Sequence, residues 1–474
     1  MTGTTRRQYL GTAGIALGSL LSAACDLNLP LPGQATPKST IRFFIRNHPR
    51  NQANRPVQIA AFIEKFPNIA VEIEWHAAKF FIPEETLASR VAAGTVPDVF
   101  ELGEFLVPRA AQDGWALDLL PRLKQDQDDA DDFYPAVLAA GRYAGTQVAL
   151  PEAWSPYIMY VNRGLFEQAQ LPLPDHTWTY DHWLQVAARL TQAEADPPIW
   201  GALYNTWGMP LLHTLWAWGG DLVSADGQRC ALDSQPAVAA LQWIADLWLK
   251  HRVAPSLADL RRLRGIWFSL FPTGRIGLLP HFYLTPNIAW LVERDSSARK
   301  TPGIDWSVRE NPALDWAVTT VPIGPAGRET SSWPESYSIA VSTANPDAAW
   351  EWLKFLTSAA GFAAAGSPTG WVASIPEARR VDLLEVRGVM MPARQSLADH
   401  PLLQQDAVLT ERGVLPAFIE TAKTLRPPQH IPNYDEVLPA FWRGCQPIWA
   451  GTQTASQAID DLVPTINDLL AKVP

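Results

Sequence analysis

The sequence is poor in cysteine, in charge and in positive charge above all. Three cysteines among 474 residues exclude a disulfide framework and a cysteine-rich zinc cluster. Charged residues make up 18%, and 38 Lys and Arg face 48 Asp and Glu, for a net charge of −10. Nucleic-acid binding draws its affinity from basic residues that neutralise phosphates, so this balance argues against it.

Motifs of catalysis and metal binding are missing as well. The nine histidines are scattered, and we find no His-Glu-x-x-His, no Cys-x-x-Cys, no Gly-x-Ser-x-Gly elbow and no Gly-x-x-x-x-Gly-Lys phosphate loop. We therefore expect no metal site, no cofactor and no catalytic residue. The acidic run at residues 126–132 lacks the Gly and Glu that a calcium loop needs, so we interpret it as a solvated turn.

Apolar and aromatic residues, by contrast, are abundant. Hydrophobic residues are 47% of the chain, with 41 prolines and 21 tryptophans. This composition is typical of a globular protein, and the length suggests two or three folding units. Because 21 tryptophans exceed what a core of this size needs, we expect some of them to line a binding surface.

The first 37 residues have the pattern of an export and anchoring segment. Paired Arg6 and Arg7 precede an apolar stretch up to residue 24 that is too short to span a bilayer. Residues 1–24 are therefore predicted to be an export signal, and the arginine pair indicates the twin-arginine route. Cys25 is either a lipidated first residue or an ordinary cysteine near a cleavage site, and residues 25–37 form a Pro- and Gly-rich tether. Whether Cys230 and Cys445 pair is left open by the sequence.

Strand and helix patterns alternate through the remaining chain. Strands are expected at residues 40–45, 69–74 and 98–100. Helices are expected at 57–66, 87–93, 183–191, 237–250, 348–358 and 455–471. This alternation predicts an α/β chain with largely parallel sheets and flanking helices.

Several fragments along this chain resemble one protein family in order and spacing. They are GTVPDVF at 94–100, ALP at 149–151, YVNRGLFE at 160–167, TWTYD at 177–181, GGD at 219–221, TGRIG at 273–277 and AAWEWLKFLT at 348–357. Together they resemble the extracellular solute-binding proteins (family 1) of carbohydrate ABC transporters, in their bacterial lipoprotein form.

The resemblance implies a fold and a set of partners. It implies a type II two-lobe periplasmic-binding-protein fold with the ligand in a cleft between the lobes. Lobe 1 would span 38–148 plus 335–392, and lobe 2 would span 149–334 plus 393–474. The partners would be a carbohydrate, the transmembrane subunits of an ABC permease, and a membrane reached through a lipid on Cys25. We expect a monomer on the outer face of the cytoplasmic membrane, with no bound nucleic acid.

A sugar site needs aromatic faces and a rim of polar groups. The loops that this fold would bring to the cleft supply both kinds of side chain. The candidate ligand-binding residues are Asn47, His48, Glu101, Trp154, Tyr157, Trp207, Trp216, Trp218, Asp221, Phe282, Tyr283, Trp333, Glu335, Tyr337 and Arg394.

Structural roles compete for several of these candidates. We interpret Trp216 and Trp218 as strand residues, and at least one of them could pack in the core instead of the site. Glu101 could cap a helix, and Arg394 could form an ion pair between the lobes. Trp154 and Trp333 fall in predicted loops at the crossings, where we favour ligand contact.

The ligand and the class of function have alternatives too. Aromatic residues are dense between 207 and 218, which favours an oligosaccharide or a glycoside, with a polyol phosphate as the alternative. A secreted glycoside hydrolase would need a carboxylate pair such as Glu101 with Glu104 or Glu152 with Glu335. A lipid-anchored adhesin would bind no small ligand.

Overall fold

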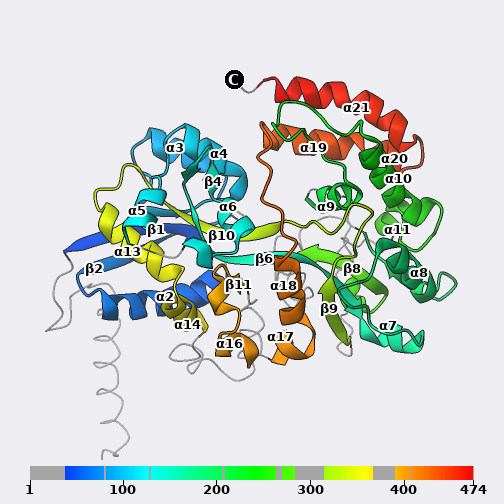
Figure 1. Ribbon diagram of the computed structural model, residues 1–474, viewed down its shortest axis with the longest axis horizontal. Coiled ribbons are helices and arrows are strands. Elements are labelled where there is room, and N and C mark those ends of the chain that lie inside the picture. The colour runs from blue at the N-terminus through cyan, green and yellow to red at the C-terminus, as the bar shows by residue number, and fades with distance from the viewer. Residues whose placement is uncertain are drawn as a thin grey trace, which may run out of the picture.

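Two α/β lobes, joined by a shared strand, make up the computed structural model (Figure 1). The structure describes residues 38–47, 49–78, 82–126, 130–204, 206, 209–262, 270–282, 314–366, 390–405 and 407–472. Within these ranges, no helix has both the length and the apolar character that a bilayer crossing requires.

The strands form one continuous path from lobe to lobe. Its order is β2 (Ile69–His76), β1 (Ser39–Arg46), β3 (Val99–Glu101), β10 (Ser332–Ile339), β6 (Leu150–Asn162), β8 (Ile276–Phe282) and β7 (Trp200–Ala202). Strands β9 (Trp316–Thr320) and β11 (Met391–Pro392) also pair with β6. The outer pairs β1–β2, β1–β3 and β7–β8 are parallel, and every pair that includes β6 or β10 is antiparallel.

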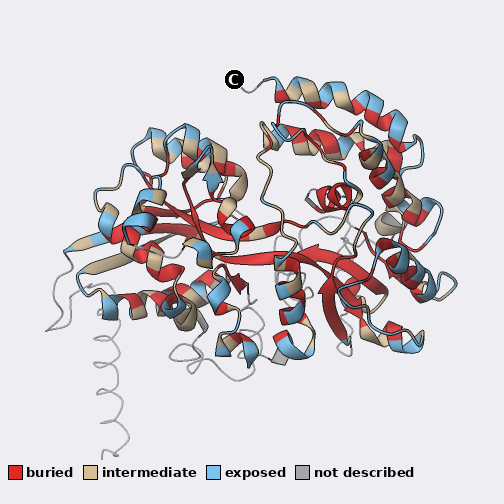
Figure 2. Cartoon of the chain, viewed as in Figure 1, coloured by how far each residue is buried: buried red, intermediate tan, exposed pale blue. Residues whose placement is uncertain are grey.

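Strand β6 belongs to both lobes. Residues 150–156 pair with β10 of the first lobe, and residues 157–162 pair with β8 and β9 of the second. All but one of its thirteen residues are buried (Figure 2). The chain therefore first crosses between lobes within β6, near Pro156, and crosses back between β9 and β10. The lobe boundaries expected from the sequence stay a prediction.

Helices cover the first lobe on both faces of its sheet (Figure 1). They are α2 (Pro49–Lys65), α3 (Glu84–Ala92), α4 (Val107–Gln112), α5 (Leu120–Gln125), α6 (Pro135–Ala139), α13 (Pro346–Leu356) and α14 (Ala359–Gly366). A small hairpin of β4 (Arg142–Tyr143) and β5 (Thr146–Gln147) lies beside them. In α13, Trp352 is fully buried against Phe43 and Phe62, because the apolar positions of this helix repeat at helical spacing.

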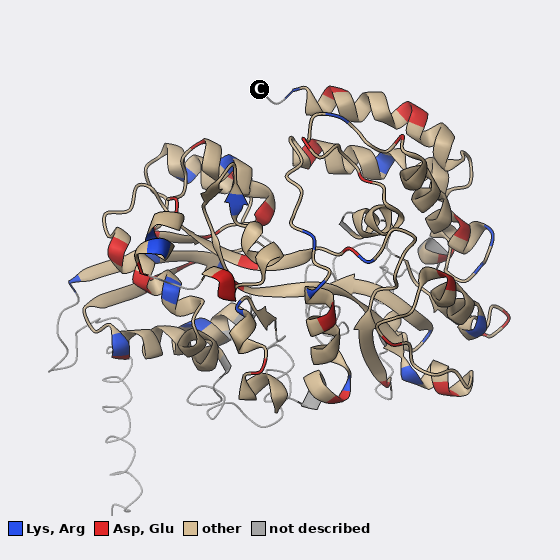
Figure 3. Ribbon diagram, viewed as in Figure 1, with Lys and Arg blue, Asp and Glu red and all other residues tan. Residues whose placement is uncertain are grey.

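The second lobe is mostly helical outside its sheet. Its helices are α7 (Arg163–Gln168), α8 (Tyr180–Leu190), α9 (Met209–Trp218), α10 (Gln235–Leu249), α11 (Leu257–Arg262), α19 (Tyr434–Gly444), α20 (Gln446–Trp449) and α21 (Ala455–Leu470). Helices α16 (Pro401–Gln404), α17 (Ala407–Glu411) and α18 (Val414–Ala422) lie below β6 (Figure 1). Strands β8 and β9 carry no charged residue, and the charges of this lobe lie on its helices and loops (Figure 3).

The helices and strands predicted from the sequence are confirmed, with ends that shift by up to eight residues. Helices α2 and α3 begin eight and three residues before the expected 57 and 87. The expected strand at Trp216 and Trp218 was wrong, because both residues lie in helix α9. Cys230 and Cys445 are free buried thiols in the core of the second lobe, so they do not form a disulfide.

Candidate functional site

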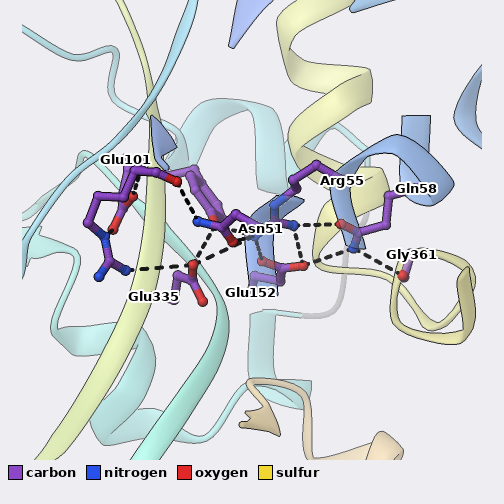
Figure 4. A network of polar contacts seen from close by, with 9 residues as sticks. Asn51, Arg55, Gln58, Glu101, Glu152, Glu335 and Gly361 are labelled. Carbon is purple, nitrogen blue, oxygen red and sulfur yellow. Dashed lines mark hydrogen bonds and ion pairs between the residues drawn. The ribbon is translucent and has the colours of Figure 1, made fainter. Parts of the chain in front are cut away.

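A network of charged side chains lies where β6 and β10 enter the first lobe (Figure 4). Its centre is Arg55 of α2, whose side chain is 2% exposed. Its two terminal nitrogens donate to the two carboxylate oxygens of Glu152 over 2.8 and 2.7 Å. Gln58, one helical turn further on, donates to Glu152 over 2.9 Å and to the carbonyl of Gly361 over 3.1 Å. The network thus ties α2 to β6 and to α14.

A second guanidinium extends the network toward β3. Arg46, at the end of β1, hydrogen-bonds Glu101 through its side chain and through its backbone N–H, the latter over 3.1 Å. Glu335 on β10 lies 3.8 Å from Arg46 Nη2 and 3.7 Å from Arg55 Nη2. The hydroxyl of Tyr337 accepts a hydrogen bond from Arg55 and donates to Glu335 over 3.1 Å.

Charge balance explains how this network is tolerated inside the protein. Burial alone would lower the pKa of Arg55, but attraction to Glu152 and Tyr337 outweighs burial and raises it. Both oxygens of Glu152 are occupied by one guanidinium, which is a strong, geometrically fixed pairing. Glu152 and Glu335, one of the two carboxylate pairs considered for a hydrolase, are therefore engaged with Arg55 rather than arranged about an open position.

An aromatic cluster lies at the two crossings, next to the network. We define it as Tyr157 of β6, His213 of α9, Phe282 of β8 and Trp333 of β10. The ring centroids of Tyr157 and His213 are 4.0 Å apart, and Phe282 meets both Tyr157 and Trp333 edge to face at 5.2 and 5.5 Å. Tyr157 and Phe282 are buried, whereas Trp333 keeps part of its surface exposed.

His213 is the polar member of this aromatic cluster. Its Nε2 is 2.8 Å from the hydroxyl of Ser331, and its Nδ1 is buried without a hydrogen bond. Desolvation lowers the pKa of His213 to about 3, so the ring is neutral at physiological pH. The cluster is therefore uncharged, in contrast to the network beside it.

A third group of polar and aromatic residues follows helix α9. Trp216 donates from Nε1 to Asp221 over 3.1 Å, and Asp221 also pairs with Arg426 at 2.5 Å. The guanidinium of Arg426 lies 4.7 Å from the centre of the Trp216 ring. Trp218 packs against Tyr180 and Trp243 at 4.8 and 4.9 Å and belongs to the packing of the helical core.

The structure places eight of the candidate residues in these three groups. Glu101, Glu335 and Tyr337 share the charged network, Tyr157, Phe282 and Trp333 share the aromatic cluster, and Trp216 and Asp221 share the α9 group. Asn47 is exposed directly after β1 and accepts from Gln52 over 2.5 Å. His48, Trp207, Tyr283 and Cys25 lie outside the described residues.

Two candidates have surroundings that differ from those expected. Trp154 lies within β6 instead of in a loop, is 0% exposed, and packs edge to face with Tyr134 and Phe418. As placed, it offers no face to a ligand. Arg394 lies 3.6 Å from Asp132 and 4.3 Å from the Phe133 ring centre, and it donates to the carbonyl of Thr357. All three neighbours precede β6 or follow β10, so they belong to the first lobe.

Arg55, Gln58 and His213 were not among the residues predicted from the sequence. The spacing of the sequence could have indicated the first two. Successive intervals of four, three and four residues separate Asn51, Arg55, Gln58 and Phe62. This spacing puts them on one helix face, and Phe62 marks that face as buried. Polar residues at buried helix positions indicate a paired network. Within the described ranges, no group of three or more His, Cys, Asp or Glu could hold a metal ion.

Comparison with known proteins decides the family. The family model described as bacterial extracellular solute-binding protein matches residues 51–254 and 294–361, which is more than half of the chain. The chain belongs to this family of solute-binding proteins. Among curated proteins, none matches the chain.

Solved structures of similar fold come from several bacteria. An ABC substrate-binding protein from Listeria monocytogenes in complex with cycloalternan has a TM-score of 0.69 at 20% identity, over 92% of this chain and 99% of that chain. The sugar-binding protein MalE from Xanthomonas citri has a TM-score of 0.67 at 19% identity, over 91% of this chain and 98% of that chain. A cyclo/maltodextrin-binding protein complexed with maltotetraose has a TM-score of 0.67 at 16% identity, over 93% of this chain and 98% of that chain. They confirm the type II two-lobe α/β fold of this solute-binding protein.

Proposed function

We propose that this solute-binding protein is the substrate-binding component of an ABC importer for a carbohydrate. It captures an oligosaccharide or a glycoside between its lobes and delivers it to the membrane permease. Family membership supports the capture of a solute. Structural relatives complexed with cycloalternan and with maltotetraose support a sugar as that solute.

The observation that carries the proposal is the aromatic cluster at the lobe crossings. A pyranose presents C–H faces that pack on aromatic rings and hydroxyls that need polar partners. Trp333 is a partly exposed aromatic side chain beside buried Tyr157 and Phe282. Asp221 and Arg426 provide partly exposed polar groups on the second lobe. A sugar stacked on Trp333 would therefore find hydroxyl partners on the facing lobe.

Ligand binding would then be linked to closure of the lobes. Groups of both lobes can contact one sugar only when the lobes approach each other, so the ligand binds the closed form more tightly and shifts the population toward it. Closure would bring together the surface that the permease recognises. The protein itself performs no catalysis in this scheme.

Export and anchoring complete the proposal. We infer that residues 1–24 are a twin-arginine signal and that Cys25 carries a lipid that holds the protein on the outer face of the cytoplasmic membrane. Residues 25–37 would act as the tether. The Pro- and Gly-rich composition of this segment supports a linker. The protein would act as a monomer.

Native mass spectrometry with a mixed pool of oligosaccharides, aryl glycosides and polyol phosphates tests the proposal. We expect one intact sugar to add its mass to one copy of the protein. A polyol phosphate adding its mass instead would keep the transport role and change the ligand class. Shortened sugars accumulating in the pool would contradict the proposal and favour a hydrolase. Absence of any adduct would contradict small-ligand binding and favour an adhesin.

A further inference from the structure

The lobes contact each other at a second place, away from the crossing strands. Phe105 belongs to the 3-10 helix Glu104–Leu106 of the first lobe, and Tyr434 begins α19 of the second. Their rings are stacked, with centroids 5.8 Å apart and an interplanar angle of 15°. In Figure 1 the first turn of α19 points toward the lobe that holds α4 and β4.

A second aromatic pair lies nearby and joins the same two lobes. Tyr143 of β4 meets His430 edge to face, with centroids 5.4 Å apart. His430 also hydrogen-bonds through Nε2 to the carbonyl oxygen of Arg142 over 2.9 Å. The contact therefore combines ring packing with one directional bond to the backbone of the hairpin.

Three of the four partners are fixed within their own lobes by packing on the core there. Phe105 and Tyr143 pack against the buried cluster that includes Leu106 and Trp115 of the first lobe. Tyr434 packs against the large core of the second lobe, and α19 lies along α21 there. The pairs are thus contacts between two rigid bodies and cannot persist when the lobes separate.

An ionisable carboxyl beside the Phe105–Tyr434 pair, that of Glu104, is largely shielded from solvent. Glu104 is half-buried as a residue, yet desolvation raises the pKa of its carboxyl to about 8. Desolvation also raises the pKa of Tyr434, with a further contribution from Glu104. Ring contacts that exclude water in this way strengthen the association of the surfaces they join.

We propose that Phe105–Tyr434 and Tyr143–His430 form a latch that holds the lobes closed before a ligand arrives. The crossings fix one side of the interface between the lobes, and the latch fixes a point remote from them. It sets the free energy of the closed form and therefore the share of molecules that are closed without ligand. Only its effect on ligand affinity rests on the function proposed above.

Small-angle X-ray scattering of the ligand-free protein tests the latch without any ligand. We expect wild type to have the radius of gyration of this structure, in which the lobes touch through both pairs, and Phe105→Ala and His430→Ala each to increase it. Phe66→Ala is the matched control, since Phe66 packs on Phe62 within the first lobe and its loss leaves the lobe positions unchanged. An unchanged radius of gyration in both latch variants, or an open wild type, would overturn the proposal.

Titration with maltotetraose separates this proposal from the transport function. We expect Phe105→Ala and His430→Ala to bind it about two- to tenfold more weakly and to become compact again when saturated. If no variant and no wild type binds maltotetraose, the choice of sugar fails while the scattering result still decides the latch. Phe105→Leu, which keeps an apolar side chain without the stacked ring, should open the lobes even if Phe105→Ala misfolds.

Discussion

The charged network of the first lobe and the aromatic cluster beside it use their side chains in opposite ways. The network holds Arg46 and Arg55 against three carboxylates, and each charged group in it has a partner within the lobe. The aromatic cluster is neutral and ends in Trp333, which keeps exposed surface. The polar residues of the network therefore stabilise the lobe, whereas Trp333 keeps the exposed aromatic surface that the proposed sugar site requires.

This difference follows from the cost of burial. A buried charge must be paired, so a guanidinium at Arg55 commits Glu152, Tyr337 and Glu335 to its own neutralisation. An aromatic ring has no such requirement and can remain partly exposed at small cost. Substitutions in the two regions should accordingly separate stability from binding.

Removing the charge of Arg55 should have the largest effect. In Arg55→Met, Glu152 loses both of its hydrogen bonds from the guanidinium. The variant should lose about 3–5 kcal/mol of unfolding free energy, because it leaves the largely buried carboxylate of Glu152 uncompensated. Urea unfolding followed by circular dichroism measures the loss.

Two further variants show whether pairing is the cause. The double variant Arg55→Met with Glu152→Gln should recover part of the loss, because the uncompensated charge is gone. Arg109→Met removes an exposed pair with Asp113 and should change stability by at most about 1 kcal/mol. If Arg55→Met and Arg109→Met lost the same free energy of unfolding, the buried network would contribute no more to stability than an exposed ion pair.

Trp333 and Trp154 test the contrast with one residue type. Trp333→Ala should weaken sugar binding by about 1–3 kcal/mol, since it removes a stacking platform, with little loss of stability. Trp154→Ala should instead cost about 3–5 kcal/mol of stability through a core cavity. Isothermal titration with the sugar that native mass spectrometry identifies, together with urea unfolding of both variants, gives both quantities. Weaker binding in Trp154→Ala with unchanged affinity in Trp333→Ala would reverse the assignment.

Acid should act on the aromatic cluster through His213. The pKa of His213 is lowered to about 3 in the folded protein, whereas an exposed histidine titrates near pH 6.5. Between these values the unfolded chain binds more protons, so stability falls as pH decreases below about 6.5, by about 1.4 kcal/mol per pH unit for one histidine.

The variant His213→Phe isolates this contribution. It keeps a ring beside Tyr157 and removes the titratable group, so its stability should depend less steeply on pH between about 4 and 6 than that of wild type. His281, whose pKa is lowered to about 4 by burial, should leave a residual slope in the variant. Identical slopes in wild type and variant would show that His213 is not desolvated in solution.

Most elements of the fold could be predicted because their signals are local. The dense β-branched run at residues 40–45 and the alternation at 69–74 correspond to β1 and β2. The prediction for Trp216 and Trp218 was wrong because aromatic residues favour strands. Helix α9 is apolar at all positions except His213 and Thr214, and a short apolar run of this kind has no clear period. Strand β6 was not foreseen as one element, because its partners β8, β9 and β10 come from distant parts of the chain.

The sequence predicted where the candidate residues lie, but not which of them stabilise the lobe and which stay exposed. Motif order placed Tyr157, Trp333 and Glu335 near the crossings and Glu101 after the third strand, and the structure puts Glu101 on β3 beside β10. Their division into network and cluster depends on Arg55, which only the face shared by positions 51, 55, 58 and 62 of α2 could have revealed. The burial of Trp154 depends on Phe418 of α18, more than 250 residues further along the chain, and no local pattern carries that information.

Strand β6 also limits how the molecule can be taken apart. Its residues 150–156 complete one sheet and its residues 157–162 complete the other, so any cut between them leaves each half with an unpaired edge. The buried cluster of the first lobe likewise includes Ile158 and Tyr160 from beyond the crossing. The two lobes can change their relative angle, yet they share their cooperativity: heat or denaturant should melt them as one unit, and neither half would make a self-sufficient expression fragment.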